Sequence, residues 1–294
     1  MPNPLPPPPT IEQVCDKALR LPCAPSLLPR LSAALNSDDA SAQEIERLIS
    51  LDTSLAGATL RLANSAALGR GKVDSLENAI FRLGAKEIFR LAALVLVNRW
   101  EAGQNLSPRW EPGDFSRHAL ITAIGAEVLA ETTGRVDPQT VYTAGLISDI
   151  GKLAIAHGCA EYYGEIRQYC DQAGCTWEEA ERKVLGYHHG DAGVRLLRAW
   201  NFPAQFVQVV EHQLRPNEAP APVVPMLSHL LAAKYLALAM GPGVAADGFL
   251  VSVPGAFLTE WGFTSELMEA AMPTVVERAS ARLGEKLTHG QVAI

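Results

Sequence analysis

The chain has 294 residues, of which 48% are hydrophobic and 19% are charged. This composition is typical of a folded protein with a sizeable core and argues against general disorder. The formal net charge is −7 at pH 7 and no run of Lys and Arg occurs. Both features weigh against non-specific binding to nucleic acid, so no nucleic-acid partner is expected.

The cysteines and the apolar runs bear on where the protein acts. None of the five cysteines forms a C-x-x-C pair, and the first residues, MPNPLPPPPT, do not resemble a secretion leader. The most apolar run, MLSHLLAAKYLALAM, is interrupted by polar residues. It is also shorter than the roughly 20 apolar residues that a bilayer span needs. We therefore expect a cytoplasmic protein without a membrane partner.

In chain order, the pattern is helical almost throughout. Residues 1–9 are proline-rich and predict an extended, flexible tail. SAQEIERLISLD places Ile45, Leu48 and Ile49 at helical spacing, and SLENAIFRLG is a second amphipathic segment that ends on Gly84. No run alternates with a period of two residues, so the predicted fold class is all-α.

Breaks in composition divide the chain. EAGQNLSPRWEPGD separates a predicted N-terminal helical subdomain, residues 10–105, from a second helical subdomain, residues 106–240. Within the second, TWEEAERKVLG opens with Thr176 and has Glu179 three residues later, which predicts a capping box. MGPGVAADG follows a long apolar helix and separates a small helical C-terminal extension, residues 241–294.

Four side chains on separate predicted helices are candidates for a metal site. Asp149 follows the apolar run AGLIS, so it is expected to be buried, and a buried carboxylate needs a partner. His118, His189 and His212 each lie near an end of a predicted helical segment. Imidazoles and a carboxylate from different helices meet only in the core between them, which is how helical bundles build metal sites.

The order of these residues resembles a known family. His118, then Asp149 inside SDIGK, then His189 and His212 are similar to the pattern of the HD superfamily of metal-dependent phosphohydrolases, nearest to its HD-GYP branch. LPCAPSLLPRL, LRLANSA, AIFRLG and AWNFP resemble the HDOD domain, its non-catalytic relative. This resemblance covers roughly residues 20–240. It implies a multihelical HD-like bundle with an N-terminal helical subdomain, in a bacterial signalling protein.

The departures from the HD pattern concern the metal ligands. Ser148 replaces the histidine of the His-Asp pair, Gln213 replaces one of a double histidine, and the late aspartate aligns with Ala233. The candidate ligands that remain are His118, Asp149, His189 and His212. This set suits a single divalent metal, Fe, Mn or Zn, but not a two-metal clamp. We therefore expect no cofactor or at most one such metal, and no catalytic residue.

Three interpretations of Asp149 stay open at this point. It is a buried acid paired with a histidine or a backbone amide, a ligand of one metal, or part of a working catalytic site. Lys152 lies one turn later and is expected to form a salt bridge with it rather than to bind phosphate. Ser148, Lys152, Arg61 and Asn64 are further candidates for ligand binding, although Asn64 is expected to bond to the local backbone instead.

The resemblance implies a non-catalytic output module that acts through signalling proteins or a small-molecule ligand, and it leaves a homodimer open. One alternative is a metal-dependent phosphohydrolase or phosphodiesterase with a depleted metal site, which predicts bound metal and turnover of a phosphoester. Another is a sensor that holds a nucleotide-like ligand in the vacated metal cavity or in a cleft between the subdomains.

Overall fold

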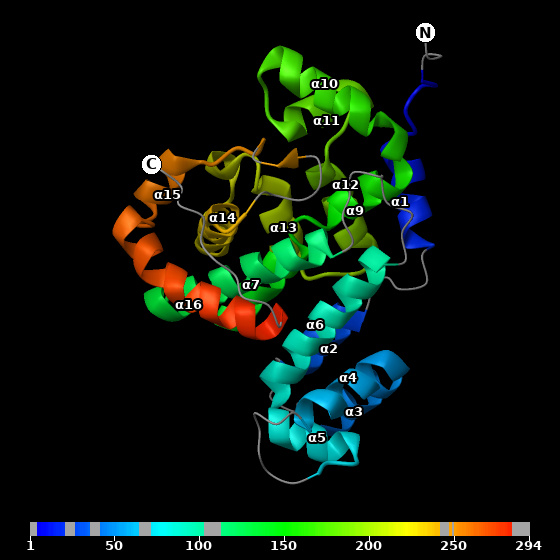
Figure 1. The fold of residues 1–294 in the computed structure, drawn as a ribbon, viewed down its shortest axis with the longest axis vertical. Coiled ribbons are helices and arrows are strands. Elements are labelled where there is room, and N and C mark those ends of the chain that lie inside the picture. Colours follow the sequence, from blue (N-terminus) through cyan, green and yellow to red (C-terminus); the bar gives the residue numbers. More distant parts are fainter. Residues whose placement is uncertain are drawn as a thin grey trace. The chain divides into compact units, whose positions relative to one another are not determined.

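The residues that the computed structural model describes are 5–20, 27–35, 42–64, 72–102, 113–241, 247–248 and 250–283. Most of them are helical and no strand occurs within these ranges, so the predicted all-α fold class is confirmed. The chain forms two compact units (Figure 1), which we call the small unit, Pro22–Trp100, and the large unit, Met1–Leu21 with Glu101–Ile294. Across the described helices, none combines the length and hydropathy that a bilayer crossing requires.

The small unit is built from short helices. They are α2 (Leu27–Leu35), α3 (Ala42–Ser50), α4 (Thr53–Ala63), α5 (Leu76–Leu83) and, up to Trp100, α6 (Ala85–Ala102). Helix α3 contacts α2, α4 and α5. Its residues Ile45, Leu48 and Ile49 are all buried, as their helical spacing predicts. Helix α5 ends at Gly84, whose φ of 78° favours glycine over any other residue.

The large unit contains the remaining helices. They are α1 (Ile11–Leu19), α7 (Asp114–Thr133), α8 (Pro138–Ile147), α9 (Ile150–Gly158), α10 (Tyr163–Ala173), α11 (Trp177–Leu185), α12 (His189–Ala199), α13 (Ala204–His212), α14 (Val224–Ala239), α15 (Gly255–Glu260) and α16 (Ser265–Leu283), with 3-10 turns at Ala160–Tyr162 and Pro216–Glu218. Helix α7 is buried along most of its length and packs against α8, α14 and α16 (Figure 1). Helix α9 packs against α1 and α12. The predicted capping box at Thr176 and Glu179 is confirmed at the start of α11.

Glycine allows α9 and α12 to approach closely. A Cβ atom added at Gly151 would lie 1.9 Å from the carbonyl oxygen of His189 and 2.5 Å from the backbone nitrogen of Gly193. No side chain fits into this space without moving one of the helices. The contact brings His189 towards Asp149, the residue that precedes α9.

The division into units differs from the predicted ranges at both ends of the chain. Helix α1 lies in the large unit rather than with residues 10–105, because Val14 packs against Gly158 of α9. The predicted extension, residues 241–294, belongs to the large unit as well, since its helix α16 packs against α7.

The proline-rich segment is anchored where it is described. The sequence predicts a flexible tail over residues 1–9. The hydroxyl groups of Tyr162 and Tyr187 donate hydrogen bonds to the carbonyl oxygens of Pro6 and Pro9, at 2.8 and 2.9 Å. Proline-rich backbone exposes unpaired carbonyl groups, and these two tyrosines bind them, which fixes the segment on the large unit.

Candidate functional site

Asp149 lies at the junction of α8 and α9, where the backbone departs from helical geometry for one residue (φ −104°, ψ 14°). All residues of α8 from Val141 to Ile147 are buried. The side chain of Asp149 is itself only 7% exposed and makes no capping bond to α9. The carboxylate of Asp149 is therefore buried after the apolar run, as the sequence predicts. It needs partners from other helices.

Lysines, rather than a histidine or a backbone amide, are the main partners of Asp149. The Nζ atom of Lys234, on α14, lies 2.8 Å from Oδ1. The same ammonium group donates to Oε1 of Gln213 at 2.7 Å, and Nε2 of Gln213 donates to the carbonyl oxygen of Ser148 at 3.0 Å. These hydrogen bonds connect α14 and Gln213, the residue after α13, to the junction of α8 and α9 at Asp149.

The predicted salt bridge between Lys152 and Asp149 is present, but it is the longer of two ion pairs. The Nζ atom of Lys152 lies 3.9 Å from Oδ2 of Asp149 and 2.5 Å from Oδ2 of Asp247. Asp247 is 1% exposed and precedes α15 in the chain. With Lys234, two ammonium groups and two carboxylates therefore share the interior, and each charge offsets the desolvation of another.

The pKa values of these groups follow from burial and from their neighbours. Burial alone would raise the pKa of Asp149, but the ammonium groups of Lys152 and Lys234 outweigh it and hold this pKa well below its usual range. Burial would lower the pKa of Lys152, whereas Asp149 and Asp247 raise it above its usual range. The pKa of Lys234 is lowered, because burial, aided by repulsion from Lys152, exceeds the attraction of Asp149.

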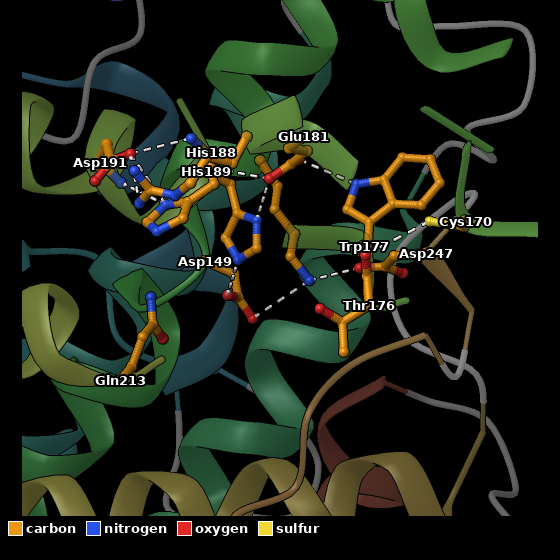
Figure 2. A network of polar contacts seen from close by, with 12 residues as sticks. Asp149, Cys170, Thr176, Trp177, Glu181, His188, His189, Asp191, Gln213 and Asp247 are labelled. Atoms are coloured by element: carbon orange, nitrogen blue, oxygen red, sulfur yellow. Dashed lines mark hydrogen bonds and ion pairs between the residues drawn. The ribbon is translucent and has the colours of Figure 1, made fainter. Parts of the chain in front are cut away.

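A second buried carboxylate orients His189. Glu181, on α11, accepts a hydrogen bond from the backbone N–H of His189 at 2.8 Å and lies 2.7 Å from its Nδ1 atom. Its other oxygen accepts the indole N–H of Trp177 at 3.0 Å, so Glu181 lies between the two rings (Figure 2). A carboxylate at Nδ1 favours a proton on that nitrogen. Nε2 then faces Asp149 at 3.9 Å, which is longer than a hydrogen bond.

Only three of the four predicted metal residues meet. His118, Asp149 and His189 line one small cavity of about 50 Å³, together with the two lysines. Burial lowers the pKa of His118 to about 4, so its imidazole is neutral at physiological pH. His212 is not among the lining residues, and its Nδ1 lies 2.8 Å from the carbonyl oxygen of Gln208 in its own helix. The cavity has room for a few water molecules and is far smaller than the roughly 300–1,000 Å³ of typical ligand pockets.

Two of the predicted ligand-binding residues, Ser148 and Asn64, form local hydrogen bonds. Ser148 is buried, and its hydroxyl group donates to the carbonyl oxygen of Gly145 at 3.2 Å. Arg61 and Asn64 are exposed residues of the small unit. The side-chain amide of Asn64 bonds to both the N–H and the C=O of Val73, each at 2.7 Å, in the backbone role that was expected of it. Ligand binding by any of these residues stays a prediction.

The donors around Asp149 do not fit a divalent metal. Within the described ranges, no group of three or more His, Cys, Asp and Glu side chains could hold one. Ala233, the position predicted for the late aspartate of the HD pattern, packs against Gly125 of α7. The next residue, Lys234, places an ammonium group on the carboxylate of Asp149 instead. A second cation there would be repelled by that charge.

Sequence reasoning missed three charged members of this network: Glu181, Lys234 and Asp247. A signal existed for Lys234, which is the only Lys, Arg, Asp or Glu in the apolar run MLSHLLAAKYLALAM. A charge on a largely apolar helix needs a buried partner, and Asp149 was already expected to need one. In the sequence, Glu181 lies among other charged residues and Asp247 lies in a Gly-rich break. Neither sequence context predicts a buried acid.

Comparisons with known proteins concern the whole fold. A family model described as the HDOD domain matches residues 21–216. An HDOD domain protein of unknown function from Geobacter sulfurreducens has a TM-score of 0.71 and 20% identity, with 93% of this chain and 97% of that chain covered. A suspected signal transduction protein from Marinobacter aquaeolei has a TM-score of 0.72 and 22% identity, with 94% and 60% covered.

A suspected phosphohydrolase from Shewanella amazonensis has a TM-score of 0.65 and 23% identity, with 91% of this chain and 93% of that chain covered. At identities this low, the three structures show a shared fold. Among curated proteins, no match was found.

Proposed function

Because the chain belongs to the HDOD domain family, we propose that it is a non-catalytic output module of bacterial signal transduction, which acts by binding a partner in the cytoplasm rather than by turning over a substrate. One observation carries the proposal: the ammonium group of Lys234 lies 2.8 Å from Asp149, the carboxylate that would bind metal in an active relative. The charge that a metal would supply is already present as part of the chain.

The contacts of Gln213 and the chemistry of Ser148 support the same conclusion. Gln213 is bonded to both Lys234 and the backbone of Ser148, and Ser148 is a poor ligand for a transition metal. Metal-assisted hydrolysis needs an open coordination position beside several fixed ligands, and Gln213 and Ser148 supply neither.

A direct test is phosphodiester hydrolysis. Bis(p-nitrophenyl) phosphate would be incubated with the full chain and with Fe²⁺, Mn²⁺ or Zn²⁺ in turn, and p-nitrophenolate release followed by absorbance. The matched control is the double variant Asp149→Asn with Lys234→Met, which removes the ion pair without leaving an unpaired charge. We expect the wild type and this control to be equal to the metal-only rate. Turnover by the wild type that is lost in the double variant would instead establish the phosphohydrolase alternative.

A further inference from the structure

A large apolar groove lies beside the charged site, between α14, α15 and α16 of the large unit. Its volume is about 790 Å³. Its apolar lining includes Leu236 of α14, Leu258 of α15, and Met268 and Met272 of α16. Methionine side chains are flexible and polarisable, and surfaces rich in them adapt to varied apolar partners. The groove has the composition of a binding surface rather than of a packing defect.

The length of the groove suits an elongated occupant. Along α16, the lining residues run from Ser265 to Glu277. At a helical rise of about 1.5 Å per residue, this stretch is about 18 Å long. An incoming helix of about 12 residues has the same length, and a groove between helices is a common receptor for one apolar helix face.

The polar groups that line the groove favour a partner with positive charge. Glu269 and Glu277 are the charged residues among the described groove lining, and both are exposed. Pro273, also in the lining, has no N–H group, so the carbonyl oxygen of Glu269 receives no hydrogen bond from the residue four positions later. Carboxylates and a carbonyl oxygen accept hydrogen bonds, so a partner that offers ammonium or guanidinium donors fits this lining.

Exposed apolar side chains mark one end of the groove. Tyr235 is 39% exposed and Val253 is 42% exposed, and both line the groove. The same two residues also line the small cavity at Asp149 and Lys234. A partner that covers this end would remove apolar surface from water, which is the main driving force for association.

We propose that the groove between α14, α15 and α16 binds a basic amphipathic helix of a partner protein, with its apolar face on Met268 and Met272 and its basic residues on Glu269 and Glu277. The proposal rests on the output role above, because it names the class of partner through which that role is exercised. The apolar lining supplies affinity, and the acidic residues select a basic helix over an acidic one.

The test uses two fluorescein-labelled helical peptides of 14 residues with the same leucine positions, spaced i, i+3, i+4 and i+7. One carries lysine and the other glutamate at the remaining positions. Fluorescence anisotropy with the full chain should show binding of the lysine peptide only. The double variant Glu269→Gln with Glu277→Gln should weaken this binding by about threefold to tenfold, since contacts between exposed charges are individually weak but both are removed.

The matched control changes the same number of charges elsewhere. Glu161 and Glu165 are exposed glutamates of the segment around α10, and their double replacement by Gln should leave binding unchanged. An equal loss in both double variants would mean attraction to the acidic surface in general and would overturn the proposal. Binding of the glutamate peptide, or of neither peptide, would do the same. A dimer of the chain that excludes the peptide would assign the groove to a second copy.

The result of the peptide-binding test can be distinguished from the result of the phosphodiester-hydrolysis test. If the lysine peptide fails to bind and no phosphodiester is hydrolysed, the non-catalytic role stands and the groove assignment is wrong. If the peptide binds as expected and hydrolysis is also observed, the groove assignment stands and the non-catalytic role is wrong.

Discussion

Replacing Asp149 by asparagine tests the ion pair between Asp149 and Lys234. The change keeps the shape of the side chain but removes its charge. Lys234 then retains the neutral Gln213 at 2.7 Å, while Lys152 retains Asp247 at 2.5 Å. The perturbation therefore leaves one buried ammonium group, that of Lys234, without the carboxylate it contacts in the wild type.

The expected loss of stability follows from that uncompensated charge. Removing one partner of a buried ion pair costs about 3–5 kcal/mol. The side chain of Lys234 is 18% exposed, so some water reaches it and the lower end of this range applies. We expect the free energy of unfolding to fall by about 3 kcal/mol, which lowers the urea midpoint by roughly 1–2 M.

The pH dependence has a defined sign. Because the folded pKa of Asp149 is depressed, its contribution is fully present above its unfolded pKa of about 3.9 and is lost as pH falls towards the folded value. The difference between the wild type and the variant should therefore be largest near neutral pH and shrink below about pH 4. It should also shrink at high pH, where Lys234 of the folded variant loses its proton.

Urea unfolding followed by circular dichroism measures this loss, with two controls. Asp171→Asn removes a surface ion pair with Arg167 whose side chains are 57% and 42% exposed, and it should change stability by less than about 1 kcal/mol. Asp149→Asn combined with Lys234→Met should recover most of the loss, because no charge is left unpaired. A loss below about 1 kcal/mol for Asp149→Asn, or no recovery in the double variant, would show that Lys234 does not depend on Asp149 for its charge compensation.

Three further predictions concern the frame of the site. Gly151→Ala should lower the free energy of unfolding by about 1–3 kcal/mol, because its Cβ would lie 1.9 Å from a backbone oxygen. Gly164→Ala, where a Cβ meets nothing within 4 Å, should be neutral or stabilising in thermal unfolding. Glu101→Gln should cost about 1–2 kcal/mol, since this buried carboxylate accepts backbone N–H groups at the start of α7. In NMR titrations, the imidazole of His118 should stay neutral from pH 8 down to pH 5, because burial lowers its pKa to about 4. Titration near its ordinary pKa would contradict that burial.

The helices and the location of the site were predictable from sequence because they depend on local patterns. Apolar spacing predicted α3, and the position of Asp149 after an apolar run predicted its burial. The partners of Asp149 were not predictable in the same way. Lys234 is 85 residues away along the chain, and its pairing with Asp149 depends on how α14 packs against α7 and α8. The periodicity of one helix does not specify its neighbours.

The resemblance to the HD pattern led to the prediction of a depleted metal site, but it gave no sign that Lys234 contacts Asp149. It aligned the late aspartate with Ala233, which faces α7, whereas the adjacent Lys234 enters the cavity. Neighbouring residues on a helix point about 100° apart, so an alignment displaced by one residue changes which side chain meets the site. The contacts of Pro6 and Pro9 were not predictable for a related reason, since Tyr162 and Tyr187, which donate hydrogen bonds to them, lie far along the chain.

Metal content by mass spectrometry tests whether Lys234 stands in place of a metal at Asp149. The full chain would be purified without a histidine tag or chelator, beside the double variant Asp149→Asn with Lys234→Met. We expect Fe, Mn and Zn far below one ion per chain in both proteins. Near-stoichiometric metal in the wild type that disappears in the double variant would contradict this expectation.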